Sequence, residues 1–165
     1  MKSFKSFTIL FILLFAVWLL LTSTTRSDEL LTGLIVSIVI AIVLAKFSQI
    51  FESVSLSPKS LILIPVYLVI FLWEMIKSNI DVALRVINPK LPINPGIVKI
   101  KTNLKSPLAK LILANSITLT PGTLTLDVKG DYLYIHWIDV KDEDIVGATE
   151  DISKKFEKTL KEIVQ

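Results

Sequence analysis

Residues 7–47 read FTILFILLFAVWLLLTSTTRSDELLTGLIVSIVIAIVLAKF and contain two long apolar runs separated by a short polar stretch. Residues 6–25 and 30–45 carry no charged side chain. At a rise of about 1.5 Å per residue, the runs would form helices of roughly 30 and 24 Å, close to the thickness of a bilayer's hydrocarbon core at about 30 Å. Only a backbone whose hydrogen bonds are satisfied internally crosses that core. The stretch therefore predicts an antiparallel hairpin of transmembrane helices at residues 4–22 and 30–47.

Two features of this hairpin bear on its packing. Gly33 and Ser37 lie four residues apart, a spacing that lets a neighbouring helix approach closely, although two small residues also fall at this spacing by chance. Trp18 lies near the far end of the first helix, where an amphipathic ring suits the membrane interface.

Composition limits the classes of function. Hydrophobic residues make up 52% of the 165 residues, and the mean hydropathy of +0.66 is too high for an ordinary soluble domain. The absence of cysteine excludes disulfides and thiolate metal sites, and one histidine does not make a multi-histidine metal site. The net charge of +3 lies in residues 1–95, whereas residues 96–165 hold ten basic and ten acidic residues. This balance argues against nucleic-acid binding, which requires a surface of one sign.

A third apolar segment is expected at residues 60–87. Ser57 and Pro58 are typical of a helix start, with serine as N-cap and proline in the first turn. Pro65 is expected to kink the helix. The segment would be about 40 Å long, and the sequence leaves open whether it crosses the membrane completely. Residues 89–96 contain three prolines and are expected to form a stiff linker between a membrane part, residues 1–88, and the rest of the chain.

The second half of this segment carries charges on one face. Glu74, Lys77, Asp81 and Arg85 follow at steps of three, four and four residues. One interpretation is a helix that leaves the membrane with its charges paired at the surface. The other places Glu74 at membrane depth, facing other proteins, where an ionisable residue is a functional candidate. In the second interpretation, Glu74, Lys77 and Asp81 contribute to a cation path or to an inter-subunit contact.

Residues 97–165 have the pattern of a small α/β domain of order β-α-β-β-α, with two helices on one face of the sheet. Leu124, Leu126 and Val128 alternate in the second strand and are expected to face inward. Thr120 to Thr123 has proline and then glycine at its centre, which indicates a type II turn. The expected strands are 97–101, 123–128 and 132–138, and the expected helices are 108–115 and one running from 145 to 163. The fold class is thus a membrane helical hairpin plus a third helix, followed by this domain.

Residues able to carry catalysis are scarce. His136 is the sole imidazole, and the many hydroxyl groups between Ser116 and Thr125 have no base beside them. No glycine-rich phosphate loop is present. We therefore expect no catalytic residue, no metal site and no cofactor.

The run ANSITLTPGTLT at residues 114–125, followed by LYIH at 133–136, closely resembles the E subunit of the Mrp/Mnh multi-subunit sodium/proton antiporters. The same subunit type occurs in membrane-bound hydrogenase complexes. The resemblance implies a membrane assembly in which several subunits together exchange sodium for protons, and it transfers no catalytic residue to this chain. The signature residues are interpreted as structural: Asn115, Thr118, Thr120, Pro121, Gly122, Thr123 and His136.

Two functions remain open from the sequence. The first is an accessory subunit of a cation/proton antiporter module, without enzymatic activity of its own, whose partners are other membrane subunits of an Mrp-type antiporter or a membrane-bound hydrogenase complex and the lipid bilayer. The second is a membrane-anchored adaptor whose α/β domain binds a soluble partner, with the strand at 97–101 as a free sheet edge. We expect a multi-pass protein of the cell membrane with a cytoplasmic C-terminal domain. A cytoplasmic C-terminal domain conflicts with the positive-inside rule if all three segments cross the membrane, because Lys2 and Lys5 would then lie outside.

Overall fold

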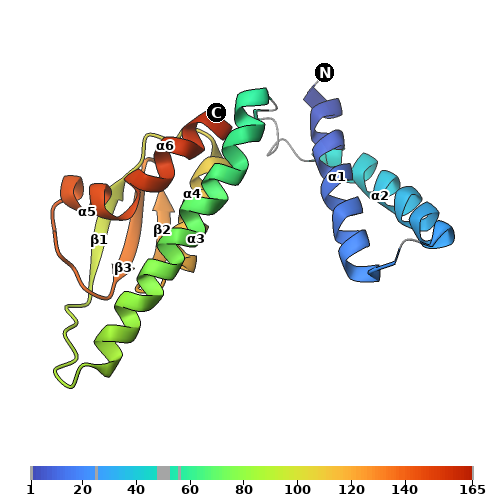
Figure 1. Cartoon of the computed structure of the whole chain (residues 1–165). Coiled ribbons are helices and arrows are strands. Elements are labelled where there is room, and N and C mark those ends of the chain that lie inside the picture. The colour runs from blue at the N-terminus through green and yellow to red at the C-terminus, as the bar shows by residue number, and fades with distance from the viewer. Residues whose placement is uncertain (1, 25, 48–52, 56, 165) are drawn as a thin grey trace. The chain divides into compact units, whose positions relative to one another are not determined.

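The computed structural model describes residues 2–24, 26–47, 53–55 and 57–164. It divides after Ser53 into two units, each described here by itself. Among the described residues, three helices are long and apolar enough to cross a membrane, at residues 4–22, 27–45 and 58–87. The predicted fold class of apolar helices followed by a small α/β domain is confirmed (Figure 1).

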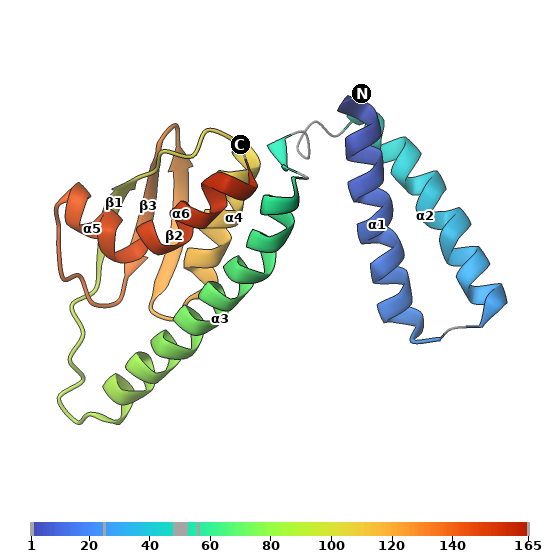
Figure 2. The same ribbon diagram turned by 45° about the horizontal axis from the view of Figure 1, so that its top comes forward.

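The first unit is a helical hairpin of α1 (Lys2–Thr22) and α2 (Ser27–Phe47) (Figure 2). Trp18 of α1 donates from Nε1 to the carbonyl oxygen of Glu29 at 3.1 Å. A Cβ atom added at Gly33 would overlap the Trp18 indole, so glycine is what lets the ring lie against α2. Trp18 therefore closes the hairpin in addition to lying near a helix end. Small residues recur at every fourth position of α2 and are buried: Gly33, Ser37, Ala41 and Ala45.

The second unit begins at Val54 and has α3 as its longest helix. Its elements are α3 (Pro58–Ile87), β1 (Gly96–Lys101), α4 (Pro107–Leu119), β2 (Thr123–Lys129), β3 (Tyr132–Trp137), α5 (Ile145–Ile152) and α6 (Lys154–Ile163). The three strands form an antiparallel sheet in the order β1-β3-β2. The strand at 97–101 is therefore a sheet edge, as expected, although its last residue, Lys101, donates its N–H to Thr149 Oγ1 of α5 at 3.0 Å.

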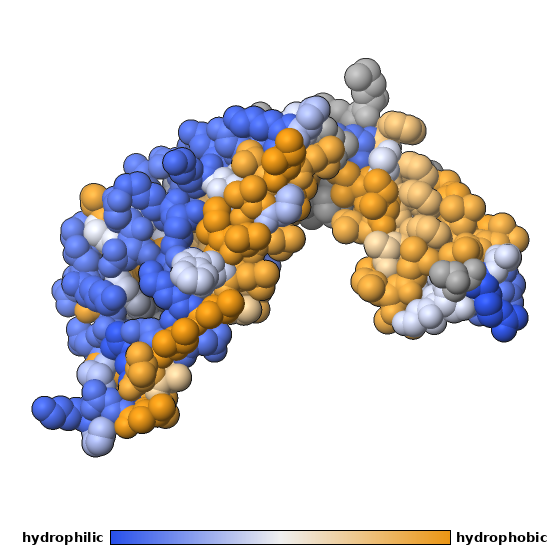
Figure 3. Space-filling view, viewed as in Figure 1, coloured by the Kyte–Doolittle hydropathy of each residue, from blue (hydrophilic) through white to orange (hydrophobic). Residues whose placement is uncertain are grey.

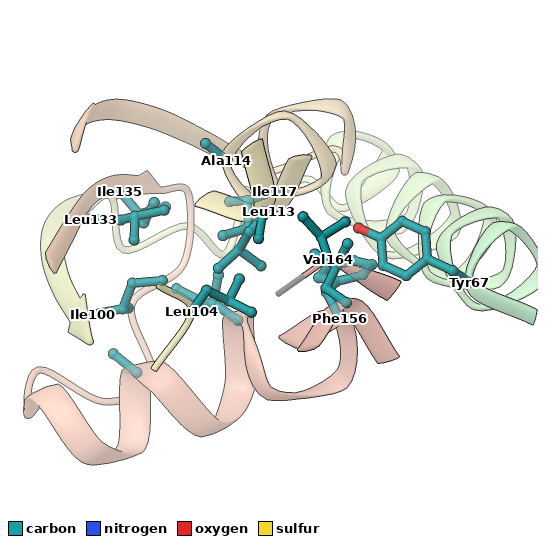
Figure 4. Packing of buried hydrophobic residues seen from close by; sticks show 14 of the residues in the cluster. Tyr67, Ile100, Leu104, Leu113, Ala114, Ile117, Leu133, Ile135, Phe156 and Val164 are labelled. Carbon is teal, nitrogen blue, oxygen red and sulfur yellow. The ribbon is translucent and has the colours of Figure 1, made fainter. Parts of the chain in front are cut away.

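The core of this unit lies between the sheet and helices α4, α5 and α6, and α3 adds to it (Figure 4). Tyr67 of α3 is 8% exposed and belongs to the same cluster as the residues of the α/β domain. The cluster also includes Val98, Ile100, Leu113, Ile117, Leu133, Ile135, Phe156 and Leu160. The third apolar segment is thus not separate from the domain that follows it in sequence. The expected domain boundary at residues 89–96 instead joins two parts of one unit.

The predicted inner face of β2 is wrong. Leu124, Leu126 and Val128 are all at least 40% exposed, whereas Thr123 and Thr125 are half-buried. The threonine hydroxyls donate to carbonyl oxygens of α4, Thr123 to Ile117 and Thr125 to Ala114, at 2.6 and 3.0 Å. These bonds hold the threonines against the helix, and a register shift between Thr125 and Asp127 changes the alternation beyond them.

The helix expected from 145 to 163 is divided into α5 and α6 at Ser153. No glycine or proline marks the break, which is why the sequence pattern did not reveal it. Ile152, Phe156, Leu160 and Ile163 form a buried stripe along the two helices, whereas Ile145 is 38% exposed.

The predicted helix start at Ser57 and the predicted turn are confirmed, and a second serine cap is found at Ser106. Ser57 and Ser106 are N-caps whose hydroxyls accept from the N–H groups of Ser60 and Ala109. Gly122 has a φ of 89°, and the Thr123 N–H donates to the Thr120 carbonyl, as a type II turn requires. Pro65 lies inside α3, which continues as one helix to Ile87.

The close contact at Gly33 gives a test of the hairpin. Gly33→Leu should lower the midpoint of thermal unfolding in detergent, because the added side chain overlaps the Trp18 ring and overpacking costs about 1–3 kcal/mol. Val39→Leu, at a residue 56% exposed on the same helix, is the control and should leave the midpoint unchanged. Circular dichroism measures the unfolding midpoint. Equal midpoints for both variants would contradict the packing of Trp18 against Gly33.

Candidate functional site: a charged cleft along α3

One face of α3, here called the inner face, contacts the α/β domain from the start of the helix to its end. Figures 1 and 2 show α3 lying along the domain in both views. The inner face consists of Ser60, Leu63, Tyr67, Ile70, Phe71, Glu74 and Arg85. From Ser60 to Arg85 these contacts extend over about 38 Å of helix.

The first half of the inner face is held by neutral groups. Ser60 Oγ donates to the carbonyl of Glu162 at 3.1 Å, beside a Lys59–Glu162 ion pair at 2.7 Å that lowers the pKa of the Glu162 carboxyl. The Tyr67 hydroxyl lies 2.5 Å from Ser116 Oγ of α4, and its ring meets Phe156 edge-on with centroids 6.3 Å apart. A buried tyrosine needs such a partner for its hydroxyl, so Tyr67 fixes both the depth and the rotation of α3 on the domain.

The second half of the inner face borders a cleft of about 250 Å³. Glu74 Oε2 accepts from Lys155 Nζ of α6 at 2.6 Å, with side chains only 13% and 32% exposed. Because both side chains are largely shielded from water, removing either one would leave the other charge poorly solvated. Four acidic and four basic side chains line the cleft: Glu74, Asp81, Asp139, Asp151, Lys77, Arg85, Lys141 and Lys155.

Arg85 anchors the end of α3. Its guanidinium bonds Asp81 of the same helix at 2.8 Å, Asp139 after β3 at 2.9 Å and the carbonyl of Pro92 at 2.6 Å. The proline-rich residues 89–96 are therefore tied to the domain rather than serving as a free spacer. Asn94 strengthens this attachment, since its N–H donates to the Ile138 carbonyl at 3.1 Å and its carbonyl accepts from the Val140 N–H at 2.9 Å.

The signature turn forms one wall of the cleft. Thr120, Pro121, Gly122 and Thr123 all line it. A Cβ atom at Gly122 would lie 2.9 Å from Ile138 Cγ2 and 3.6 Å from Val82 Cγ2 of α3, so the glycine provides both the positive φ and the room for α3. The signature therefore shapes the surface against which α3 rests.

Other sequence-predicted residues lie elsewhere. Asn115 and Thr118 are on the exposed side of α4, where Thr118 Oγ1 accepts from the Thr125 N–H at 3.1 Å. His136 pairs in register with Ile97 and Leu124, on the sheet face away from the buried core residues of β1 and β3. Neither Asn115, Thr118 nor His136 lines the cleft.

The structure thus brings Glu74, Lys77 and Asp81 together with four of the seven signature residues. It also adds residues that the sequence did not indicate, namely Tyr67, Ser116, Asp139 and Lys155. A tyrosine within an apolar helix was the available signal, because its hydroxyl predicts a buried polar partner. Within the described part of the chain, no group of three or more metal-ligating side chains lies together. Since the carboxylates of Glu74, Asp81 and Asp139 all bond cationic side chains, the cleft is suited to joining α3 to the domain.

Comparisons with known proteins identify relatives over nearly the whole chain. A family model described as Na+/H+ ion antiporter subunit matches residues 11–163. The E subunit of the Na(+)/H(+) antiporter of Alkalihalophilus pseudofirmus is 36% identical over 97% of this chain and 99% of its own length, and the E1 subunit from Staphylococcus haemolyticus is 35% identical over 93% of each. A chain in the membrane-bound sulfane sulfur reductase, an archaeal respiratory membrane complex, is 48% identical, with a TM-score of 0.84 over 96% of this chain and 99% of that one.

The Glu74–Lys155 pair can be tested by exchanging its charges. Glu74→Lys should loosen the C-terminal half of α3, seen as faster amide hydrogen exchange in the full chain, because it places two cations together at a cost of about 1–3 kcal/mol. Adding Lys155→Glu should restore protection. The same exchange at the exposed pair Glu150 and Lys154 is the control and should have little effect. No rescue by the double variant would show that the pair does not hold α3.

Proposed function

Because the chain belongs to the family of Na+/H+ antiporter E subunits, we propose that it acts as an assembly subunit that fixes an α/β domain at the cytoplasmic surface of a multi-subunit membrane complex. Its family is one of transport subunits, and the chain is not an enzyme by itself. The observation that carries the proposal is the continuous attachment of α3 to the domain by Tyr67, Glu74 and Arg85.

An ion path of its own is not supported by the hairpin. Between Ser6 and Thr22 in α1 and between Leu30 and Ala45 in α2, no acidic or basic side chain is present. A cation and a proton both need ionisable or strongly polar groups at membrane depth. Any exchange of sodium for protons therefore takes place in partner subunits, and this chain contributes contacts.

The role proposed for Glu74, Lys77 and Asp81 is accordingly structural. Glu74 is bound to Lys155 and Asp81 to Arg85, which supports the contact interpretation over the cation path. Lys77 is an exposed side chain at the cleft and is the member of the three placed to reach a neighbouring subunit.

A respiratory membrane complex is the host that we propose. The chain is 48% identical to its counterpart in the archaeal sulfane sulfur reductase complex, compared with 36% for the antiporter subunit of Alkalihalophilus pseudofirmus. Both similarities cover almost the whole chain. Purification of the native complex through a tag on this chain distinguishes the hosts: redox subunits co-purify with a respiratory complex, and only multi-spanning transport subunits co-purify with a free-standing antiporter.

The orientation gives the next prediction. Arg26→Cys in the α1–α2 turn and Lys141→Cys in the α/β domain are both at exposed sites in a chain without natural cysteine. A membrane-impermeant maleimide should label the thiol at position 141 from the cytoplasmic side and the thiol at position 26 from the opposite side. Positive charges at Lys2, Lys5, Lys46 and Lys59 support this orientation. Labelling of both sites from the same side would contradict it.

The assembly role predicts how the complex responds to loss of the ion pair between Glu74 and Lys155. Glu74→Gln should reduce the amount of complex recovered through a tag on another subunit, while sodium-dependent proton exchange per assembled complex remains near the unsubstituted value. Glu150→Gln is the control and should leave recovery unchanged, since its ion pair is exposed. Reduced exchange at full recovery would instead favour a cation path. Sodium-proton exchange by the purified chain alone in liposomes would contradict the proposal as a whole.

A further inference from the structure

The face of α3 opposite the inner face, here called the outer face, is apolar and unpartnered among the described residues. Its members are between 47% and 77% exposed: Leu61, Ile62, Val69, Leu72, Ile76, Ile80 and Ile87. Figure 3 shows these apolar surfaces as an orange band that follows α3. A band of this size on a helix is a surface for lipid or protein rather than for water.

The inner face shows that α3 cannot cross the bilayer as it stands. Its attachments run from Ser60, bound to Glu162, to Arg85, bound to Asp139, a distance of about 38 Å along the axis. This exceeds the hydrocarbon thickness of about 30 Å. If α3 crossed, the charged α/β domain beside it would lie in hydrocarbon, or the Tyr67 contact and the ion pairs would be broken.

The short connection between α2 and α3 keeps the start of α3 near the membrane surface. Both ends of the α1–α2 hairpin lie on the same side if the two helices cross, and residues 48–57 are all that join α2 to α3. Ten residues reach at most about 34 Å. The start of α3 therefore stays within that distance of the headgroups.

From these observations we propose that α3 lies in the plane of the membrane, with its outer face inserted at the headgroup–acyl boundary and its inner face carrying the α/β domain above. A helix of this kind buries its apolar face by about 5–10 Å. The occupant of the outer face is thus the bilayer itself. The proposal does not depend on which complex hosts the chain.

Charge placement agrees with an in-plane helix. Lys59 and Lys77 are 18 residues apart, which is five helical turns, so both lie on the same flank between the two faces. On this flank Lys59 is paired with Glu162 and Lys77 lines the cleft, so both charges lie beside the outer face and not on it. Trp73, 64% exposed next to this flank, has the amphipathic ring that favours the interface. No acidic or basic residue occupies the outer face of α3.

The in-plane position also removes the topological conflict noted in the sequence. With only α1 and α2 crossing, the N-terminus and the α/β domain lie on the same side, so Lys2 and Lys5 are cytoplasmic together with the domain. Three crossings would place them on opposite sides.

Depth measurements on the native complex in lipid nanodiscs test the proposal. Single cysteines at Leu61, Val69, Leu72, Ile76 and Ile80 carry nitroxide labels, and accessibility to oxygen and to a nickel chelate reports their depth. An in-plane helix predicts the same shallow depth at all five positions, within about 3 Å. A crossing helix predicts that Leu61 and Leu72, 11 residues apart, differ by about 16 Å. Labels at Phe4, Leu13 and Leu20, all exposed positions of α1, give the crossing reference in the same chain.

Each outcome decides the proposal. Uniform shallow depth with high oxygen accessibility supports it. A depth that changes steadily along α3 overturns it in favour of a crossing helix. Labels that are immobilised and inaccessible to both reagents overturn it in favour of a partner subunit on the outer face. The depth of α3 and the proposed host and assembly role are tested separately. If the labelled complex stays active, none of these depth results contradicts the proposed host or assembly role.

Discussion

The bond between the Tyr67 hydroxyl and Ser116 Oγ constrains the rest of this unit. It places a polar group of a long apolar helix inside the core of the α/β domain, where an unpaired hydroxyl would cost about 1–3 kcal/mol. With the phenol fixed, the helical repeat determines the rest: Leu63 and Ile70 turn toward the same core, and Glu74 and Arg85 turn toward the domain's charges. The remaining surface of α3 is then left apolar and outside.

The signature of the E-subunit family acquires a physical meaning from this arrangement. Ser116 is the hydrogen-bond partner of Tyr67. The hydroxyls of Thr120 and Thr123 donate to carbonyl oxygens at the end of α4, and Gly122 allows the turn to lie beside Val82. None of these groups is positioned for chemistry. We interpret Ser116 and the turn at residues 120–123 as part of the docking surface for the chain's own third helix. Asn115 and His136 have no part in this surface, and no contact among the described residues explains them.

The local elements could be predicted from sequence because each has a local cause. Serine caps at Ser57 and Ser106 and the proline–glycine turn at Gly122 act over four residues, and the two hairpin helices follow from uncharged runs. What could not be predicted depends on tertiary contacts. The threonines of β2 face inward because α4 offers carbonyl oxygens, against the rule that leucine is buried and threonine exposed. The charged face of α3 was found from its spacing, but its partners Lys155 and Asp139 lie more than fifty residues away.

One face of α3 contacts the α/β domain and the other is apolar, so hydropathy alone does not show whether the helix crosses the membrane. Averaged over its length, α3 is apolar enough to be a membrane span. The average conceals that the charged residues avoid the outer face. Glu74 and Arg85 pair with Lys155 and Asp139 of the domain, while the outer face is left for lipid. Four attachments, at Ser60, Tyr67, Glu74 and Arg85, also prevent the domain from rotating about the helix. A domain held in this way has a fixed height and a fixed rotation relative to the bilayer. Partner subunits that are themselves fixed in the bilayer therefore meet one constant surface, and that constancy is what an assembly subunit without catalytic groups can supply.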